Sequence, residues 1–554
     1  MFAAILALLA AFGGALLARD ASGASPGKNI VLILTDDMTT ADLAAMPNVQ
    51  SLIAAQGTTF NHAYASFPIC CPSRATLLSG QYMHNHGVRG NLPPFGGWTR
   101  FVPHEDSALP VRLKGYGYYT AHIGKYLNFY AAENDASLHS SLPVPPGWDE
   151  WYGKVSEEAL YFNYQMIEKT SEDDPPRLTF YGDQASDYQT DVFRDRAVDF
   201  INDLDTGTQT PFLMNLWFNS PHGPFDPAPR DLFRRAGVPL PKLPGFNEKD
   251  ISDKPKWFRK QARKRLSKRQ AKVIANERRR QQEQLLSVDQ AVAELVASLS
   301  AKGILDETYL VFTSDNGFFR GEHRISAGKF LPHDPSSRIP LIIRGPDVPR
   351  GGVSSEIVWL GDLPQTFLQI ASGADSPGLD GRSLLAFAED PTRRSSRPIL
   401  LEGDTGSGGA EAESARAGVA RARAAKAGLA GRRGVKGLDQ EPNAIKSQSV
   451  VRRAPAYRAI RTDRYLFVLY SNGQAELYDM KGDPAQLRSL VGNKRFRYVR
   501  RWLFDHLIAL SGCAGASCRI ELGPEPPPLP KSVLRPKRKK KGDGKDKGRP
   551  ARNA

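Results

Sequence analysis

The run Lys28-Asn-Ile-Val-Leu-Ile-Leu-Thr-Asp36-Asp37 is a continuous apolar segment that ends in two acids. Such a run is typical of a central strand in a sheet that is covered on both faces. Open α/β sheets place their chemistry at the carboxyl ends of their strands. Asp36 and Asp37 would therefore suit a hard cation such as Ca²⁺ or Mg²⁺, although an isolated Asp-Asp pair is more often only a polar turn.

The same arrangement, an apolar segment followed by polar residues, returns three times along the chain. The segments are 118–123 before Gly124-Lys125, 211–218 before Pro221-His222, and 308–312 before Ser314-Asp315-Asn316-Gly317. Helical patterns cover residues 109–116, 191–204, 257–302 and 496–510. This alternation predicts an α/β fold, a large mixed sheet with helices on both faces. Residues 131–190 lack a clear periodicity and are expected to form an excursion over the site.

Residues 457–478 alternate apolar and polar side chains around a Ser-Asn-Gly turn at 471–473. This pattern predicts an antiparallel hairpin. Together with the helix expected over 496–510, it indicates a smaller C-terminal α+β subdomain that carries an antiparallel sheet.

A second informative stretch is Phe67-Pro-Ile-Cys70-Cys71-Pro72-Ser73-Arg74-Ala-Thr-Leu-Leu-Ser79-Gly80. Pro72 suits the first turn of a helix, where a missing N–H costs nothing. Taken alone, Cys70 at a helix N-terminus indicates a thiolate nucleophile with a low pKa. A buried cysteine pair or one end of a disulfide is the plainer interpretation.

The string Cys70-x-Pro72-Ser73-Arg74, followed by Leu78-Ser79-Gly80, resembles the signature of the sulfatase family. In that family a maturation enzyme oxidises the first Cys to formylglycine and reads the Pro and the Arg while the chain is unfolded. The resemblance implies that Cys70 is the modified residue and that a formylglycine-generating enzyme is a partner during maturation.

The resemblance extends over roughly residues 28–520. Asp36-Asp37, Gly124-Lys125, Pro221-His222, Ser314-Asp315-Asn316-Gly317 and Gly328-Lys329 follow the family's order, and Glu476-Leu-Tyr-Asp479 with Asp483-Pro484 resembles its smaller domain. The phrases Cys-Cys-Pro-Ser-Arg, Gly-Lys-Tyr-Leu-Asn and Ser-Val-Asp are similar to the N-acetylglucosamine-6-sulfatase and extracellular endosulfatase branch.

The resemblance implies a complete site for hydrolysis of a sulfated carbohydrate or an aryl sulfate. Ca²⁺, or Mg²⁺ in its place, would be held by Asp36, Asp37, Cys70, Asp315 and Asn316. One hydroxyl of hydrated formylglycine would attack sulfur, and the other would later expel sulfate. Arg74 would support the formylglycine, Lys125 and Lys329 would bind sulfate oxygens, and His222 would assist the leaving oxygen.

One position departs from the family pattern. Many sulfatases carry a His two residues after the Lys of Gly-Lys, whereas Leu127 stands there in this chain. If that His is the base that releases sulfate, another residue must replace it. His84, His86 and His323 are the candidates, although such histidines are more often structural.

Two other functions stay open from the residues alone. One is a phosphonate or phosphate ester hydrolase of the same superfamily, because it can share the Cys-x-Pro-Ser-Arg string. The other is a non-catalytic binder of sulfated polymer, although a binder needs neither four oxygen ligands nor an oxidisable Cys70.

The net charge of +15 is concentrated in two segments. Residues 254–280 carry thirteen Lys or Arg and one Glu, and residues 531–554 carry eleven and two Asp, so the rest of the chain is mildly acidic. Because the basicity is regional, no nucleic-acid partner is expected. The basic half of the 257–302 helix is either a solvated face or a surface that attracts an anionic polymer.

The ends of the chain and its cysteines indicate export. Residues 1–24 resemble a signal peptide, with an uncleaved anchor as the alternative, and no other apolar run is long enough to cross a bilayer. A secreted or cell-envelope protein is therefore expected, in which Cys513 and Cys518 form a short-loop disulfide rather than part of a metal clip. The expected units are a catalytic domain over 28–400, a flexible insertion over 404–445, a subdomain over 446–520 and a disordered basic tail over 525–554.

Overall fold

The computed structural model describes residues 27–131, 142–155, 161–205, 207, 210–404 and 453–530. The expected signal peptide, nearly all of the expected insertion and residues 531–554 of the expected tail lie outside the described residues.

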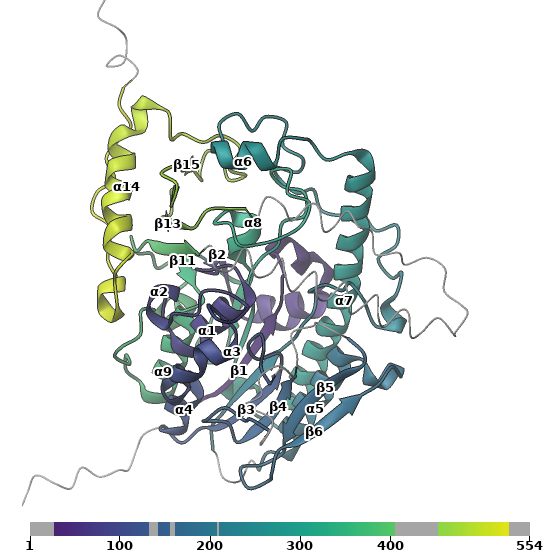
Figure 1. The fold of residues 1–554 in the computed structure, drawn as a ribbon. Helices are drawn as coiled ribbons and strands as arrows, with labels where there is room; N and C mark the ends of the chain where they lie inside the picture. Colours follow the sequence, from purple (N-terminus) through teal and green to yellow (C-terminus); the bar gives the residue numbers. More distant parts are fainter. Residues whose placement is uncertain are drawn as a thin grey trace, which may run out of the picture.

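A large mixed sheet runs through the molecule (Figure 1). Its strand order is β11-β2-β10-β8-β1-β7-β3-β4-β5-β6, with β9 beside β2. The strands are β1 Asn29–Thr35, β2 Thr58–Tyr64, β3 Tyr119–Gly124, β4 Glu150–Lys154, β5 Tyr164–Lys169, β6 Arg177–Tyr181, β7 Phe212–Trp217, β8 Thr308–Ser314, β9 Arg338–Ile339, β10 Leu341–Arg344 and β11 Gly352–Trp359. The predicted α/β class is confirmed.

β1 occupies the middle of this sheet, parallel to β7 and to β8. Every residue from Ile30 to Thr35 is buried, because helices cover both faces. Leu32 and Leu34 pack in the core beneath α1 Cys70–Ser79, α4 Leu109–Lys114 and α9 Asp362–Ser372. Val31 and Ile33 pack on the other side against α5 Gln189–Asp203 and α7 Lys268–Ala301.

The segment 131–190 departs from the expected irregular excursion. Its described residues form β4, β5 and β6, which extend the sheet beyond β3. Among the described strands β6 pairs with β5 alone, and its apolar residues Leu178 and Phe180 are exposed, so the alternation in its sequence does not mark a buried face. Periodicity alone therefore missed these strands.

A second sheet of four antiparallel strands follows toward the C-terminus. It contains β12 Ile399–Gly403, β13 Tyr457–Arg461, β14 Tyr465–Tyr470 and β15 Ala475–Asp479, in that order. The predicted turn at 471–473 joins β14 to β15, and α14 Arg497–Leu510 packs beside the sheet, at the left of Figure 1. The predicted smaller α+β unit is confirmed.

Three further features concern the C-terminal segment and the helices. Cys513 and Cys518 are bonded as a disulfide, as predicted. Glu525 contacts Arg464 and Tyr465, so the described start of the C-terminal tail is packed on the small sheet. Within the described part of the chain, no helix is both long and apolar enough for a membrane span.

Candidate active site

Three neighbouring strands bring the polar segments of the sequence to one edge of the large sheet. Because β7, β1 and β8 are parallel, their carboxyl ends coincide. Asp36 donates its backbone N–H to the Ser220 carbonyl at 3.0 Å, and Asp315 donates its own to Thr35 at 3.1 Å. The Asp-Asp pair, the His222 loop and the Asp-Asn pair are thereby fixed side by side.

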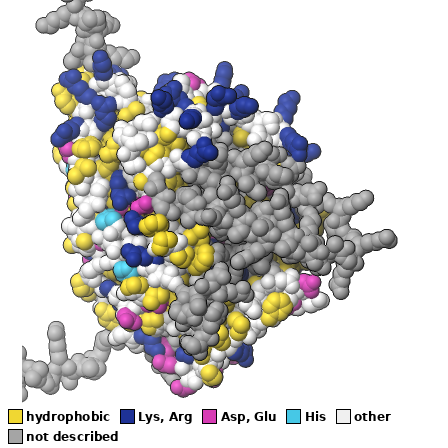
Figure 2. Space-filling view, viewed as in Figure 1, with side chains coloured by type: hydrophobic (Ala, Val, Ile, Leu, Met, Phe, Trp, Pro, Cys, Tyr) yellow, Lys and Arg dark blue, Asp and Glu magenta, His cyan; other side chains and the backbone are white. Residues whose placement is uncertain are grey.

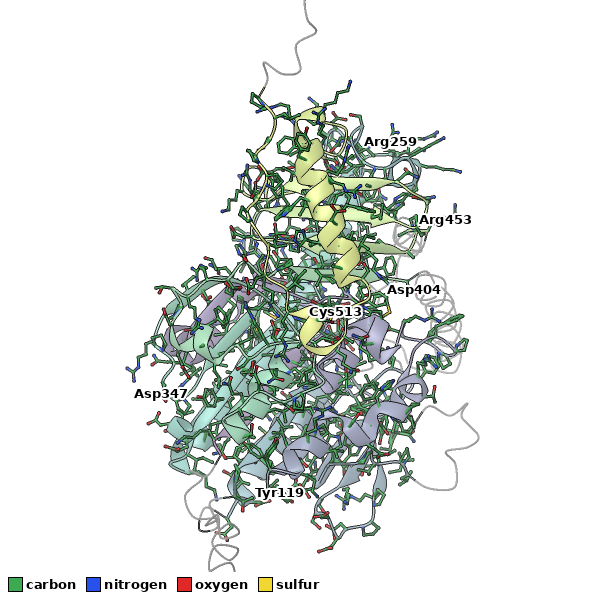
Figure 3. The ribbon with its side chains drawn as sticks, turned by 90° about the vertical axis from the view of Figure 1, so that its left-hand side faces the viewer. Tyr119, Arg259, Asp347, Asp404, Arg453 and Cys513 are labelled. Carbon is green, nitrogen blue, oxygen red and sulfur yellow. A yellow bond between two sulfur atoms is a disulfide. The ribbon has the colours of Figure 1, made fainter. Side chains whose placement is uncertain are left out.

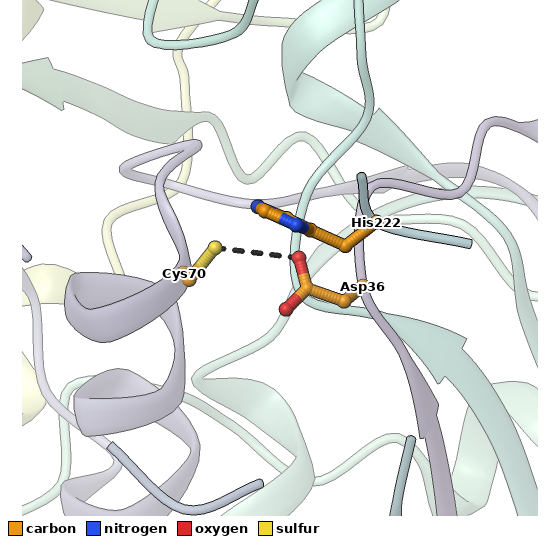
Figure 4. A group of neighbouring side chains, drawn as sticks. All are labelled: Asp36, Cys70 and His222. Carbon is orange, nitrogen blue, oxygen red and sulfur yellow. Dashed lines mark hydrogen bonds between the residues drawn. The ribbon is translucent and has the colours of Figure 1, made fainter. Parts of the chain in front are cut away.

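Cys70 lies against this edge at the start of α1, and Pro72 occupies the first turn as predicted. Its Sγ is 3.3 Å from Asp36 Oδ1 (Figure 4) and 2.7 Å from Lys329 Nζ. Burial and the Asp36 carboxylate raise the pKa of the Cys70 thiol well above its usual value, although Lys125 and Lys329 act in the opposite direction. The interpretation of Cys70 as a low-pKa thiolate is therefore wrong, because burial, reinforced by the Asp36 carboxylate, disfavours the thiolate.

Four of the proposed metal ligands form a compact group. Oxygens of Asp36, Asp37 and Asp315 and the Cys70 sulfur all lie within 4.8 Å of one another, and all four residues are buried. The fifth, Asn316, donates from Nδ2 to Asp37 Oδ1, while its buried Oδ1 has no hydrogen-bond partner. A buried carbonyl oxygen without a donor is costly unless a cation binds it. The set of oxygen donors therefore fits a hard cation.

The carboxylates are held by three cationic side chains. Arg74 is fully buried and joins the two acidic strand ends, with Nε 2.9 Å from Asp315 Oδ2 and a second nitrogen 3.2 Å from Asp36 Oδ2. Lys125 Nζ is hydrogen-bonded to Asp36, and Lys329 Nζ lies 2.6 Å from Asp37 Oδ1. Burial by itself would raise the pKa of Asp36, but Lys125, His222, Lys329 and Arg74 together lower it, so this carboxylate stays ionised.

The position of Lys125 depends on Gly124. Gly124 has a φ of 113°, and a Cβ there would lie 2.1 Å from the Trp217 carbonyl oxygen. A side chain at this position would therefore push β3 away from β7. Without one, Lys125 N–H bonds to the Trp217 carbonyl at 2.9 Å, and the Lys125 carbonyl accepts from Arg74 at 2.7 Å.

His222 lies beside the carboxylates, on the loop after β7. Its Nε2 is 3.7 Å from Asp37 Oδ2, and its Nδ1 is 2.5 Å from the Gly223 carbonyl, which fixes the ring. Tyr161 and Gln281 hold the loop by donating to the carbonyls of His222 and Pro221. Burial lowers the pKa of His222, although Asp36 and Asp37 partly counter this.

The three histidines considered as replacements for the residue at Leu127 have other partners. His84 contacts Glu402 and the Cys513 carbonyl, His86 contacts Thr76, and His323 contacts Glu248. Each is therefore engaged by the surrounding fold. His222 is the histidine that the described contacts place in the group with Cys70 and Asp36.

One residue at this edge was missed from the sequence. Arg320 is buried and donates to Asp42, to Gln281 and to the Asp37 carbonyl, so it holds the strained Asp37 backbone, whose φ is 68°. Its position three residues after Gly317 could have suggested that it lies near the site. Nothing in its local sequence indicated that it would be buried.

Comparison with known proteins gives a consistent result. A family model described as Sulfatase matches residues 28–374. Human N-acetylglucosamine-6-sulfatase is 31% identical over 409 residues, which cover 72% of this chain and 71% of that protein. A putative extracellular sulfatase Sulf-1 homolog from Caenorhabditis elegans is 34% identical over 360 residues, 64% of this chain. The chain spans about half the length of that relative, since the match covers 48% of it.

Solved structures share the fold. A protein bound to its substrate D-glucosamine-2-N,6-O-disulfate superposes with a TM-score of 0.65 at 23% identity, covering 87% of this chain and 97% of that one. The phosphonate monoester hydrolase of Agrobacterium radiobacter superposes with a TM-score of 0.60 at 19% identity, covering 87% and 95%. At these identities the likeness shows the common architecture alone.

Proposed function

Because the chain belongs to the sulfatase family, we propose that it hydrolyses sulfate monoesters, with water as the second substrate and an alcohol and inorganic sulfate as products. The observation that carries the proposal is the place of Cys70, buried among Asp36, Asp37 and Asp315 with a raised pKa. A thiol in this place is a poor nucleophile. Oxidation of Cys70 to formylglycine would supply, after hydration, the hydroxyl that attacks sulfur.

The remaining side chains have roles that follow from their charges. Asp36, Asp37, Asp315 and Asn316 would hold a divalent cation, Ca²⁺ by family resemblance, which would neutralise charge on the transferred group. Lys329 Nζ lies 2.7 Å from the Cys70 sulfur and Lys125 Nζ is hydrogen-bonded to Asp36, and both lysines would bind sulfate oxygens. Arg74 is occupied by Asp36 and Asp315, so it orients the carboxylates rather than the substrate.

His222 would handle the proton of the leaving alcohol. Its Nδ1 faces the Gly223 carbonyl, which leaves Nε2 directed toward the carboxylates and the bound ester. Its lowered pKa leaves the ring mainly neutral near pH 7, and a proton that it holds would pass readily to an alkoxide.

For the substrate we propose a sulfated amino sugar. The support is the similarity to N-acetylglucosamine-6-sulfatases and the shared fold of the structure that holds a glucosamine disulfate. Export is proposed from the apolar leader and from the similarity to an extracellular sulfatase homolog.

Mass spectrometry of the native protein tests the modification of Cys70. We expect the tryptic peptide of residues 29–74 to be lighter than the unmodified thiol form, because an aldehyde replaces the thiol, and Cys70→Ala to abolish turnover. Cys71→Ala is the matched control, since Cys71 is a neighbouring buried thiol outside the acidic group. An unmodified thiol in protein that cleaves sulfate esters would refute the formylglycine mechanism.

A substrate panel tests the reaction class. A sulfated amino sugar, an aryl sulfate and an aryl phosphonate are compared by kcat/KM. We expect the sulfate esters to be preferred. A higher kcat/KM for the phosphonate would instead favour the phosphonate hydrolase of the same fold.

A further inference from the structure

A large charged surface of the described chain lies over α6 Lys256–Gln261 and the start of α7. Figure 2 shows Lys and Arg side chains gathered there, at the top of the view. Between residues 254 and 276 the sequence has no Asp or Glu. Nine Lys or Arg side chains are exposed: Lys256, Arg259, Lys260, Arg263, Lys264, Arg265, Lys268, Arg269 and Lys272. We call these nine residues the basic surface.

The basic surface is largely without counter-charges from the protein. Apart from Arg269, none of its members forms an ion pair with an acid of the described residues. Of the acids just before it, Glu248 and Asp253 are bound to Lys254, which is buried, whereas Asp250 is exposed and has no ion pair to the basic surface among the described residues. Like charges so close together repel each other unless an anionic partner binds them.

The backbone that carries these charges is fixed rather than loose. Phe258 is fully buried, and Trp257 packs edge-on against Tyr470. Ser267 caps α7, and Asn247 is hydrogen-bonded in both directions to the backbone of Leu266. The cations are therefore presented by a rigid frame, which lowers the entropy lost on binding.

This frame is joined directly to the candidate active site. The Arg324 guanidinium donates to the carbonyls of Glu248, Lys249, Ala262 and Arg263. Arg324 belongs to the same loop as Lys329. Along α7, Gln281 donates to the Pro221 carbonyl and accepts from Arg320, at the edge that holds Asp37.

The separation between the basic surface and the site favours a polymer. Lys268 and Gln281 are thirteen residues apart on one continuous helix. At about 1.5 Å per residue this corresponds to about 20 Å. A single sulfated sugar bound at Cys70 would not reach the basic surface. A chain of several sulfated sugars would contact the site and the basic surface together.

The side chains of this surface favour a sulfated polysaccharide over a single-stranded nucleic acid. Surfaces that bind single-stranded nucleic acid combine cations with aromatic rings on which bases stack. Here Phe258 is buried and Trp257 is covered by Tyr470, so the exposed members are all Lys or Arg.

We propose that the basic surface anchors a sulfated polysaccharide whose sulfate esters are presented to the Cys70 site. The proposal rests on the proposed function for its substrate class, but the binding it describes does not require turnover. In this arrangement the anchored chain raises the local concentration of ester at the site. It adds nothing to the chemical step.

The test compares two triple variants. Arg259→Ser/Arg263→Ser/Lys264→Ser removes three exposed cations from the basic surface; Arg259 is labelled in Figure 3. The matched control, Arg350→Ser/Arg393→Ser/Arg394→Ser, also removes three exposed cations. Gly352 lies beside Pro391, so the segment of Arg350 and the segment of Arg393 and Arg394 are close together. Asp347, three residues before Arg350, is labelled in Figure 3 on the side of the molecule opposite Arg259. None of the six residues contacts the site.

Binding is measured first, in a Cys70→Ala background on immobilised heparin, a sulfated polysaccharide. We expect the basic-surface variant to elute at clearly lower salt than the parent, and the control variant to elute with the parent. Equal elution of the two variants would overturn the proposal. Single-stranded DNA that displaced the protein from heparin as well as soluble heparin does would also overturn it, in favour of a nucleic-acid partner.

Kinetics of variants that keep Cys70, and with it the expected formylglycine, provide the second readout. On heparin-type polysaccharide, we expect KM of the basic-surface variant to rise about tenfold at unchanged kcat, because three exposed charge pairs are lost. On a small aryl sulfate, both constants should stay at the parent values. If the parent hydrolysed neither the polysaccharide nor the aryl sulfate, the proposed function would be refuted. The binding comparison would still show whether the basic surface anchors the polysaccharide.

Discussion

At the scale of single residues, the candidate site is a balance of buried charges. Three carboxylates, Asp36, Asp37 and Asp315, face the cations Arg74, Lys125 and Lys329 within one buried cluster. Burial of any one of these charges alone would be costly, so each depends on its partners. At the ends of β1 and β8, the buried side-chain atom that has no hydrogen-bond partner among the described residues is Asn316 Oδ1.

This oxygen leads to a prediction about metal removal. A chelator should abolish turnover and lower the free energy of unfolding, and Ca²⁺ at a hundredfold above its Kd should restore about 2.7 kcal/mol. Asn316→Ala should weaken Ca²⁺ binding at least about tenfold, because one oxygen ligand is lost. Titration calorimetry of the chelator-treated protein measures this change.

The matched control is Asn215→Ala. Asn215 is also a buried asparagine without a hydrogen-bond partner, but it lies within β7, away from the acidic group. Its Ca²⁺ affinity should equal that of the parent. Equal affinities of the Asn316 variant and the parent would exclude Asn316 as a ligand.

At the scale of elements, the loop that carries Lys329 is anchored by the small sheet. Tyr457 of β13 donates to the Phe330 carbonyl, and His333 lies 3.1 Å from Glu476 Oε2 of β15. Burial alone would raise the pKa of Glu476, but His333 and hydrogen bonds from Tyr478 and Tyr470 lower it to about 2. The ionised carboxylate therefore stabilises the folded state and, through the loop, the position of Lys329.

Glu476→Gln should lower the free energy of unfolding by about 3 kcal/mol at pH 7. The reason is that the variant loses the interactions that lower the pKa of Glu476 from 4.5 to about 2 in the folded state. A folded-state pKa of about 2 against an ordinary value of 4.5 means that the stabilisation is complete above pH 4.5 and fades as the pH falls toward 2. The difference between variant and parent should therefore shrink to about half at pH 3. Urea unfolding at the two pH values measures it.

Glu521→Gln serves as the control for this variant. Glu521 is a more exposed carboxylate that accepts hydrogen bonds from Ser396. Its replacement should change stability by less than about 0.5 kcal/mol at either pH. A pH-independent loss in the Glu476 variant would mean that packing, not charge, is responsible.

At the scale of the whole molecule, the two sheets share one hydrophobic core. Tyr64, Phe319 and Phe330 of the large unit pack in the same cluster as Tyr457 and Leu477 of the small sheet. Arg461 of β13 also donates to the Tyr64 hydroxyl at 2.8 Å. The small sheet therefore completes the fold of the catalytic unit.

Scanning calorimetry should accordingly show one unfolding transition, because the shared core links the unfolding of the two sheets. Tryptophan fluorescence and far-UV circular dichroism should change at the same temperature. Two separated transitions would contradict the shared core.

The sequence by itself determined the strands with unbroken apolar runs, the polar residues that follow them and the helix that begins at the cysteine motif. These signals are local, because a strand buried on both faces must be apolar along its length. β4 to β6 were missed because polar side chains interrupt each of these short strands, so none of them carries an unbroken apolar run, and β6 is largely exposed.

The tertiary structure alone decided how these residues act on one another. Asp36 and Asp315 are far apart in sequence, and only the parallel pairing of β1 with β8 places them on the same Arg74. The raised pKa of Cys70, the partners that occupy His84 and His323, and the buried position of Arg320 follow from that packing. Such properties arise from charge and solvent exclusion in three dimensions, which the order of residues along the chain does not record.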